Sequence, residues 1–108
     1  MKDMLGNEAV NLPEIGEEEI WVECEDWPGY FVSSFGNVRG KKSKKILIPY
    51  QDKNGYLKVW LYNTLGRKKV LISRLVAQAF CDGWDEEHNI CDHIDRCRCN
   101  NYYKNLRW

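Results

Sequence analysis

The 108-residue sequence contains no run of 18 consecutive apolar residues, so it predicts no membrane-spanning helix. It also lacks the basic-then-apolar start of a secretory signal, and export is not expected. The five cysteines are an odd number and cannot all pair, so they are interpreted as reduced thiols in a cytoplasm-like compartment. No internal repeat or low-complexity tract is present. These absences leave one compact domain, or two small modules that share a core.

The sequence also has no net charge, which taken alone argues against a nucleic-acid partner. That average hides a segregation of charge along the chain. Residues 1–26 contain nine acidic residues and one basic residue, whereas residues 27–108 contain fifteen basic and seven acidic residues. We therefore predict a mobile acidic lead-in over residues 1–19, followed by a basic protein.

Turn residues divide the chain from residue 20 to residue 72 into short strands. Strands are expected at 20–24, 30–33, 38–39, 46–49, 56–62 and 67–72, with Asn54-Gly55 as a hairpin signal. A short amphipathic helix is predicted at 73–80 with Ser73 as its N-cap, and further strands at 89–93 and 105–108. The predicted fold class is α+β: a small antiparallel β module over 20–72, then a short helix and a C-terminal hairpin over 73–108.

The β module is strongly basic. Eleven basic residues and one acid, Asp52, lie between Arg39 and Arg74. Such a surface attracts a phosphate backbone through counterion release, and the interleaved aromatic rings offer stacking surfaces for bases. A solvated sheet face beside ordinary core aromatics explains the same pattern equally well. The candidate DNA contacts in this region are Arg39, Lys41, Lys42, Lys44, Lys45, Lys58, Arg67, Lys68, Lys69 and Arg74.

The C-terminal stretch combines Asp-His-x-Asp at 92–95, Asn-Asn at 100–101 and Asn-Leu-Arg-Trp at 105–108. In this order the motifs resemble those of the HNH endonuclease family, particularly its phage and homing-endonuclease branch. Upstream, residues 28–33 and 36–39 are similar to the β DNA-binding module that often precedes the HNH core, and residues 54–59 and 74–80 to its connecting segment. The resemblance extends over about residues 18–108.

The resemblance implies a metal-dependent DNA endonuclease that hydrolyses phosphodiesters, with nicking expected of a monomer. His93 would be the general base that activates water, because a neutral imidazole can accept a proton near neutral pH. Asp92 would bind a divalent cation, Mg²⁺ or Mn²⁺, through a carboxylate oxygen. Asn105 would orient His93 across the hairpin.

Other residues near this motif have less defined roles. Arg96, Arg98 and Arg107 are candidate phosphate contacts, and Asp95 is expected to buttress the loop or to bond to Arg96 or Arg98. For the Asn-Asn pair at 100–101, turn capping and a functional role are weighed equally. A zinc site among Cys81, His88, Cys91, Cys97 and Cys99 is not favoured, because their spacing does not match Cys-x₂₋₄-Cys knuckles.

Two departures from the family pattern leave an alternative open. In the family a helix carrying the last metal ligand follows the Asn-Leu-Arg-Trp strand, whereas this sequence ends at Trp108, so the ββα unit is expected to lack its helix. Ser73 stands where family members often carry His. A second subunit could complete the site. Otherwise the protein is a catalytically incomplete HNH-like DNA- or protein-binding protein, for example a phage-encoded inhibitor or regulator. The expected location is the cytoplasm, that of the host cell for a phage-encoded protein.

Overall fold

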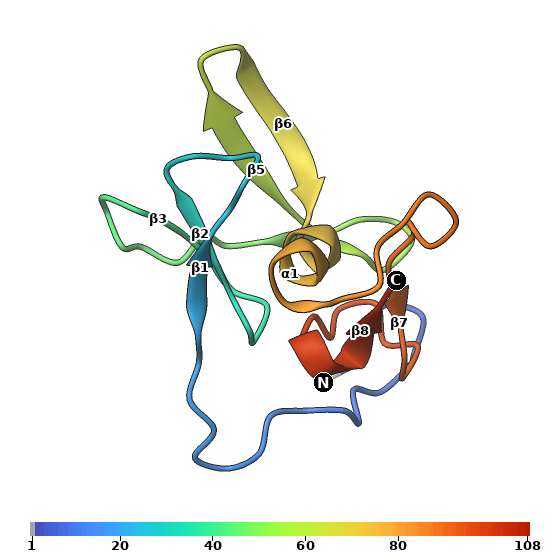
Figure 1. Ribbon diagram of the computed structural model, residues 1–108. Helices are drawn as coiled ribbons and strands as arrows, with labels where there is room; N and C mark the ends of the chain where they lie inside the picture. Colours follow the sequence, from blue (N-terminus) through green and yellow to red (C-terminus); the bar gives the residue numbers. More distant parts are fainter. Residues whose placement is uncertain (1) are drawn as a thin grey trace.

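Short strands separated by glycine-containing turns form three antiparallel sheets around one α-helix in the computed structural model, which describes residues 2–108 (Figure 1). The first sheet pairs β1 (Trp21–Glu23), β2 (Tyr30–Ser33) and β3 (Val38–Gly40) in that order. The second pairs β4 (Tyr50–Gln51), β5 (Leu57–Asn63) and β6 (Gly66–Leu71). The third is the two-stranded hairpin of β7 (Asp92–His93) and β8 (Leu106–Arg107), with the 3₁₀ turn η1 (Tyr103–Asn105) directly before β8.

The helix α1 (Ile72–Phe80) lies at the centre of the molecule and contacts strands of all three sheets. Its apolar side chains recur at helical spacing, so Ile72, Leu75 and Val76 are buried together. On β5, Val59 and Leu61 alternate with outward-facing residues and join the same core. Among residues 2–108 no helix could span a membrane.

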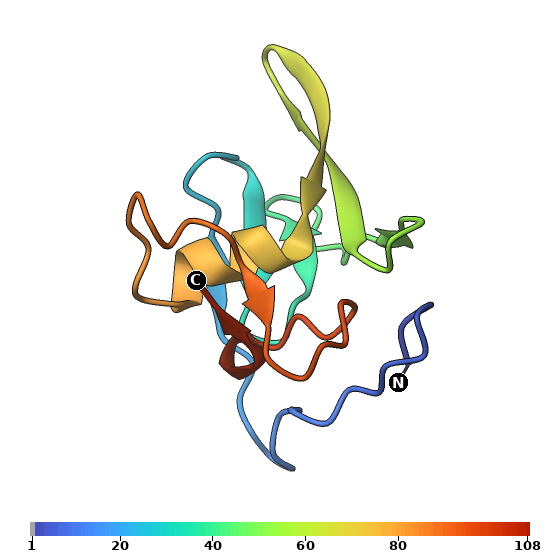
Figure 2. The same cartoon turned by 90° about the vertical axis from the view of Figure 1, so that its right-hand side faces the viewer.

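The β5–β6 hairpin projects away from the rest of the molecule, as Figure 2 shows. Its strands are paired from Lys58 opposite Leu71 to Asn63 opposite Gly66. Leu61, at the fourth of the six paired positions counted from Lys58, is completely buried, while Leu65 at the tip is 95% exposed. The hairpin is therefore anchored in the core through Leu61 and has a free tip.

The segment expected to be a mobile acidic lead-in is instead attached to the C-terminal loop, beneath which it runs in Figure 1. The carboxylate of Asp3 accepts hydrogen bonds from the backbone N–H groups of Leu5, Asn7 and Arg98. The hydroxyl of Tyr102 donates to the carboxylate of Glu17 at 2.8 Å. Buried polar groups need such partners, and the acidic residues supply them. We call residues 2–17 the strap.

Two local expectations were wrong. The helix begins at Ile72 with Leu71 in the cap position and no side-chain cap, so Ser73 is not its N-cap but a buried residue of the first turn. No strand forms over 46–49: Ile46 makes an isolated bridge to Arg39, and the next strand begins at Tyr50. Pro49 has no N–H to donate to a ladder, which accounts for the later start.

Truncation of Leu61 tests where the hairpin is anchored. Leu61→Ala should lower the free energy of unfolding by about 3 kcal/mol, because it opens a cavity in a closely packed core. Leu65→Ala at the exposed tip of the same hairpin is the matched control and should leave the midpoint of urea unfolding unchanged. Equal midpoints for the two variants would contradict this anchoring.

Candidate functional site

The β7–β8 hairpin positions the Asp-His pair. His93 pairs with Leu106 and Asp92 with Arg107, and the N–H of Ile94 donates to the carbonyl of Asn105 at 2.8 Å. Because successive strand residues face opposite sides, His93 is buried against the molecule while Asp92 is exposed. Both residues nevertheless line one cleft.

Within residues 2–108, one nitrogen of the His93 ring is hydrogen-bonded and the other is not. Its Nε2 lies 2.9 Å from Oδ1 of Asn101, and its ring centroid lies 6.0 Å from that of Tyr56. Burial lowers the pKa of His93 below its ordinary value of 6.5, although the hydrogen bond to Asn101 acts in the opposite direction. Nδ1 makes no hydrogen bond to residues 2–108 and is not sealed from solvent. A neutral imidazole with one open nitrogen can accept a proton there.

The loop between β7 and β8 is organised by the carboxylate of Asp95. It accepts hydrogen bonds from the side-chain amides of Asn100 and Asn105, both at 2.9 Å, and from the N–H of Cys97 at 2.9 Å. The N–H of Val10 in the strap also donates to it, at 3.0 Å. Burial alone would raise the pKa of Asp95, but these donors lower it below its ordinary value.

Asn105 contacts this loop and not the His93 ring. Its Oδ1 accepts the N–H of Asp95 at 3.0 Å, and its Nδ2 donates to Asp95 and to the carbonyl of Asn100. The ring was expected to be oriented by Asn105, but the structure gives that hydrogen bond to Asn101. Asp95 does buttress the loop, without a side-chain bond to either neighbouring arginine.

His93 and Asp92 line a cleft of about 590 Å³ whose other charged groups are all cationic. Arg98 is held in place because its guanidinium stacks 4.6 Å from the Tyr56 ring and donates to the carbonyl of Asn54 at 2.8 Å. The cationic side chains of the cleft are Arg96, Arg98 and Arg107. Three arginines beside a single carboxylate favour an anionic ligand such as a phosphate.

These residues fit a divalent cation only in part. One oxygen of Asp92, Oδ2, accepts a hydrogen bond from Nε of Arg107 at 3.0 Å and forms an ion pair with its Nη2, also at 3.0 Å, which leaves Oδ1 as the open carboxylate oxygen. Among residues 2–108 no group of three or more His, Cys, Asp or Glu side chains could hold a metal ion. Asp92 alone could hold Mg²⁺ only together with water and substrate oxygens.

The β module carries cations stacked on aromatic rings. The guanidinium of Arg39 lies 4.6 Å from the Phe31 ring and 4.8 Å from the Trp21 ring. On the hairpin, Arg67 and Lys69 lie 4.3 Å and 5.2 Å from the Trp60 ring. Stacking keeps these charges extended over flat surfaces without neutralising them.

One face of β5 connects this surface with the cleft. Side chains alternate along a strand, so Lys58, Trp60 and Tyr62 share a face, and the alternation continues back to Tyr56 beside His93. Register places Lys69 opposite Trp60 and Arg67 opposite Tyr62 on that face. We call it the hairpin face.

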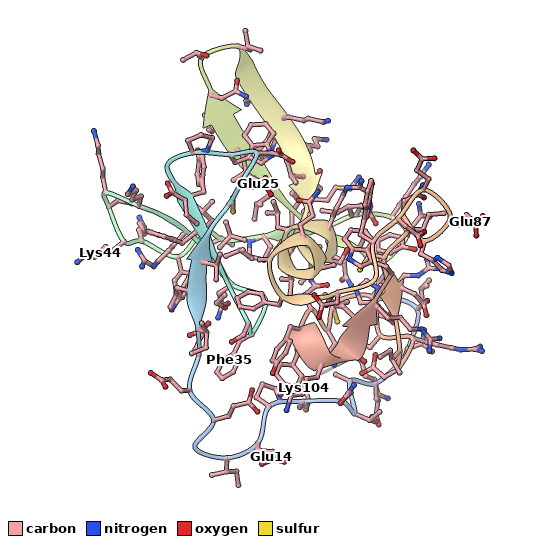
Figure 3. The ribbon with its side chains drawn as sticks, in the orientation of Figure 1. Glu14, Glu25, Phe35, Lys44, Glu87 and Lys104 are labelled. Carbon is pink, nitrogen blue, oxygen red and sulfur yellow. The ribbon has the colours of Figure 1, made fainter. Side chains whose placement is uncertain are left out.

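The remaining basic candidates lie elsewhere. Lys41, Lys42, Lys44 and Lys45 occupy the exposed turn after β3, where Lys44 points away from the molecule in Figure 3. Lys68 lies opposite Leu61, on the other side of β6 from the hairpin face. Arg74 on α1 lies 5.7 Å from the Trp108 ring and donates to the carbonyl of Asn89. Two of the candidates are ion-paired, Lys41 with Glu23 at 3.4 Å and Lys58 with Asp52 at 3.3 Å.

The five cysteines are all free thiols. Cys97 and Cys99 lie with their sulfur atoms 3.2 Å apart, while the Cys91 thiol faces the carbonyl of Ser73. Burial raises the pKa of Cys91 to about 11 and that of Cys99 to about 12. These groups are therefore protonated thiols at neutral pH.

Sequence reasoning did not single out Tyr56 or Gly36, and it gave Asn101 no specific role. Tyr56 was predicted only as part of a strand and of the connecting segment, although its ring contacts both Arg98 and His93. The Gly36 turn contacts Asn101 across 65 residues of sequence, so no local pattern reveals it. The adjacent Asn-Asn pair was the available signal for Asn101.

Comparison with known proteins identifies a NUMOD4 motif at residues 19–62. The chain is 37% identical over 89 residues to the DNA endonuclease I-HmuI of Bacillus phage SP01, covering 82% of this chain and 51% of that protein. It is 34% identical over 96 residues to the uncharacterized HNH endonuclease L247 of Acanthamoeba polyphaga mimivirus, covering 85% of this chain and 24% of the relative. It is 32% identical over 82 residues to the H-N-H endonuclease F-TflII of Escherichia phage T5, covering 75% of this chain and 42% of that protein.

A solved structure also matches. It describes DNA binding and cleavage by the HNH homing endonuclease I-HmuI, and superposes with a TM-score of 0.76 at 37% identity over 82% of this chain and 51% of that one. The chain thus spans about half, or less, of the length of these relatives. The shared fold is one of small antiparallel sheets with a helix.

Removal of the Asp95 carboxylate should destabilise the protein. Asp95→Ala leaves several donors without an acceptor, and the free energy of unfolding should fall by about 3 kcal/mol. Because the pKa of Asp95 is lower in the folded than in the unfolded state, its contribution is complete above the unfolded pKa and disappears as pH falls through the folded one. The stability difference between wild type and Asp95→Ala should therefore shrink as the pH falls below about 4.

Chemical denaturation at neutral pH and at about pH 3 measures both effects. Asp82→Ala, at an exposed aspartate of the loop after α1, is the control and should unfold like the wild type at neutral pH. A pH-independent difference for Asp95→Ala would contradict the role of the charged carboxylate.

Proposed function

This chain is a relative of the HNH endonucleases that carries a NUMOD4 motif, and on that premise we propose that it binds DNA and takes part in metal-dependent phosphodiester hydrolysis. One observation above all supports the proposal. A buried, neutral histidine has one ring nitrogen bound to Asn101 and the other without a hydrogen-bond partner in the described part of the chain, and the residue lines a cleft together with three arginines. That combination suits proton abstraction from water beside a bound phosphate.

His93 is proposed as the general base. With Nε2 engaged by Asn101, Nδ1 takes the proton from a water molecule as that water attacks phosphorus. The depressed pKa keeps the ring neutral at pH 7, so this acceptor is available. Asn105 serves the same step indirectly, because it holds the loop that carries Asn101.

Arg96, Arg98 and Arg107 are proposed to hold the scissile phosphate and to balance the charge that develops on its oxygens. Arg98 is the best positioned of the three, since Tyr56 and Asn54 fix its guanidinium before substrate arrives. A bound divalent cation would add charge neutralisation at the phosphate and the leaving oxygen, with Asp92 as its ligand from this chain.

The DNA is proposed to run from the cleft along the hairpin face. Tyr56, Lys58, Trp60 and Lys69 form a continuous series of aromatic and cationic groups on that face. Arg39 with its two rings and the basic turn after β3 provide further contacts to phosphates.

A protein that binds without cutting, the alternative raised by the sequence, is not favoured, because the named relatives are all endonucleases. The helix that the resemblance implies after residue 108, with a further cation ligand, lies outside this sequence. We therefore propose that residues 2–108 supply the base and the phosphate contacts, and that full activity also requires that ligand.

Nicking of supercoiled plasmid in the presence of Mg²⁺ or Mn²⁺ tests the function. Cutting should be lost on addition of EDTA, and His93→Ala should reduce its rate by at least about 10²-fold while leaving DNA binding intact. The matched control is His88→Ala, at the other histidine, which is exposed in the loop after α1. Cutting that persists in His93→Ala, or that is lost equally in His88→Ala, would refute the role of His93.

The salt dependence of binding tests the basic turn. Changing Lys41, Lys42, Lys44 and Lys45 to alanine should weaken binding to duplex DNA and flatten the plot of log K against log salt, by about 0.9 per lost phosphate contact. Fluorescence anisotropy at several salt concentrations measures this slope. Lys2→Ala, on the acidic strap, should not alter it, and an unchanged slope in the quadruple variant would remove the turn from the interface.

A further inference from the structure

Asn101 is a buried residue whose side-chain amide has, within the residues that the structure describes, one hydrogen-bonded atom and one atom without a partner. Its side chain is 4% exposed, and its Oδ1 lies 2.9 Å from Nε2 of His93. Among residues 2–108, its Nδ2 is the single buried side-chain nitrogen or oxygen atom that has no partner. An unsatisfied buried donor costs about 1–3 kcal/mol, so stability alone gives no reason to place an amide here.

The hydrogen bond to His93 has a chemical consequence. An amide oxygen can only accept, so Nε2 must carry the proton in this pair. A neutral imidazole has a single N–H, and Nδ1 is then left as the acceptor. If the amide were turned round, Nε2 would accept instead, and Nδ1 would carry the proton and could not act as a base.

A second segment of the chain holds Asn101 in place. Gly36, in the turn between β2 and β3, has a φ of +90°, and a Cβ added to it would lie 2.8 Å from Cβ and 2.9 Å from the carbonyl oxygen of Asn101. The neighbouring N–H of Tyr103 donates to the carbonyl of Ser34 at 2.9 Å, and the rings of Phe35 and Tyr102 pack edge to face. Figure 3 shows Phe35 at the end of that turn, facing the C-terminal segment.

We propose that Asn101, backed by Gly36 of the NUMOD4 segment, is a positioning residue that holds His93 as the Nε2–H tautomer with Nδ1 open to the cleft. The inference rests on the proposed function in that it explains how the base is prepared. Its geometric content, the position of one proton, is independent of whether the chain cuts DNA. The β module would then contribute to the site in addition to any contact it makes with DNA.

The test is long-range ¹H–¹⁵N NMR of the imidazoles at about pH 8, where a neutral imidazole is expected. The wild type should show His93 as the Nε2–H tautomer, with a directly visible, exchange-protected Hε2 proton, and the His88 resonances serve as an internal reference. Asn101→Leu removes the acceptor at similar size, so that protected proton should be lost. Asn101→Asp keeps an acceptor and should retain it, which a purely space-filling role would not predict.

The contribution of Gly36 is tested by a matched pair of glycine-to-alanine variants. Gly36→Ala and Gly29→Ala both place a Cβ at a positive φ, of +90° and +96°, but a Cβ at Gly29 meets nothing within 4 Å. Backbone strain is therefore similar, and the difference between the two variants reports the contact with Asn101. Gly36→Ala should lose the protected Hε2 signal of His93, whereas Gly29→Ala should retain it.

A wild-type His93 protonated at Nδ1, or a protected Nε2–H that survives Asn101→Leu, would overturn the proposal. If Asn101→Leu fails to fold, the wild-type tautomer and the glycine pair still decide it. Where the wild type nicks plasmid, Asn101→Leu should slow cutting by about 10²-fold and Asn101→Asp by less. An absence of nicking with the Nε2–H tautomer intact would count against the proposed function and leave this inference standing.

Discussion

Hydrogen bonds converge on the carboxylate of Asp95 from the strap, from the loop itself and from the residue that ends η1. The loop between β7 and β8 has only two residue pairs of sheet to define it, which is too little to fix its shape. The Asp95 carboxylate fixes the shape of this loop instead, because it accepts hydrogen bonds from segments that would otherwise be independent. Asn101, Arg96 and Arg98 occupy positions that this single anion sets.

The site is therefore assembled from three parts of the sequence. The hairpin supplies His93 and Asp92, the β4–β5 connection supplies Tyr56 against Arg98, and the β2–β3 turn packs on Asn101. None of these contacts is strong individually. Together they hold a neutral ring and a fixed guanidinium at one cleft, which is the kind of preorganisation that phosphoryl chemistry needs.

Sequence reasoning identified what local pattern encodes. The alternation on β5, the Asn54-Gly55 turn, the apolar face of α1 and the order of the C-terminal motifs are all local signals, and the elements they predicted are present. It misplaced the N-cap and one strand because helix and sheet ends depend on tertiary contacts. It assigned the orientation of His93 to Asn105 from resemblance, whereas the hydrogen bond comes from Asn101, four residues earlier. The strap was missed because its hydrogen bonds join it to residues far along the chain, and no local pattern in an acidic segment reveals such partners.

The strap has a consequence for the order in which the molecule can form. Its hydrogen bonds to the C-terminal loop join residues that are 84 to 95 positions apart, such as Asn11 with Asp95 and Asp3 with Arg98. On the ribosome, the strap must therefore wait until residues 95–104 have been made before it finds these partners. The first two sheets pair within residues 21–71 and are followed directly by α1, so these elements can close earlier. Within residues 2–108, the proposed chemistry thus resides in the segment that is synthesised after the first two sheets and α1.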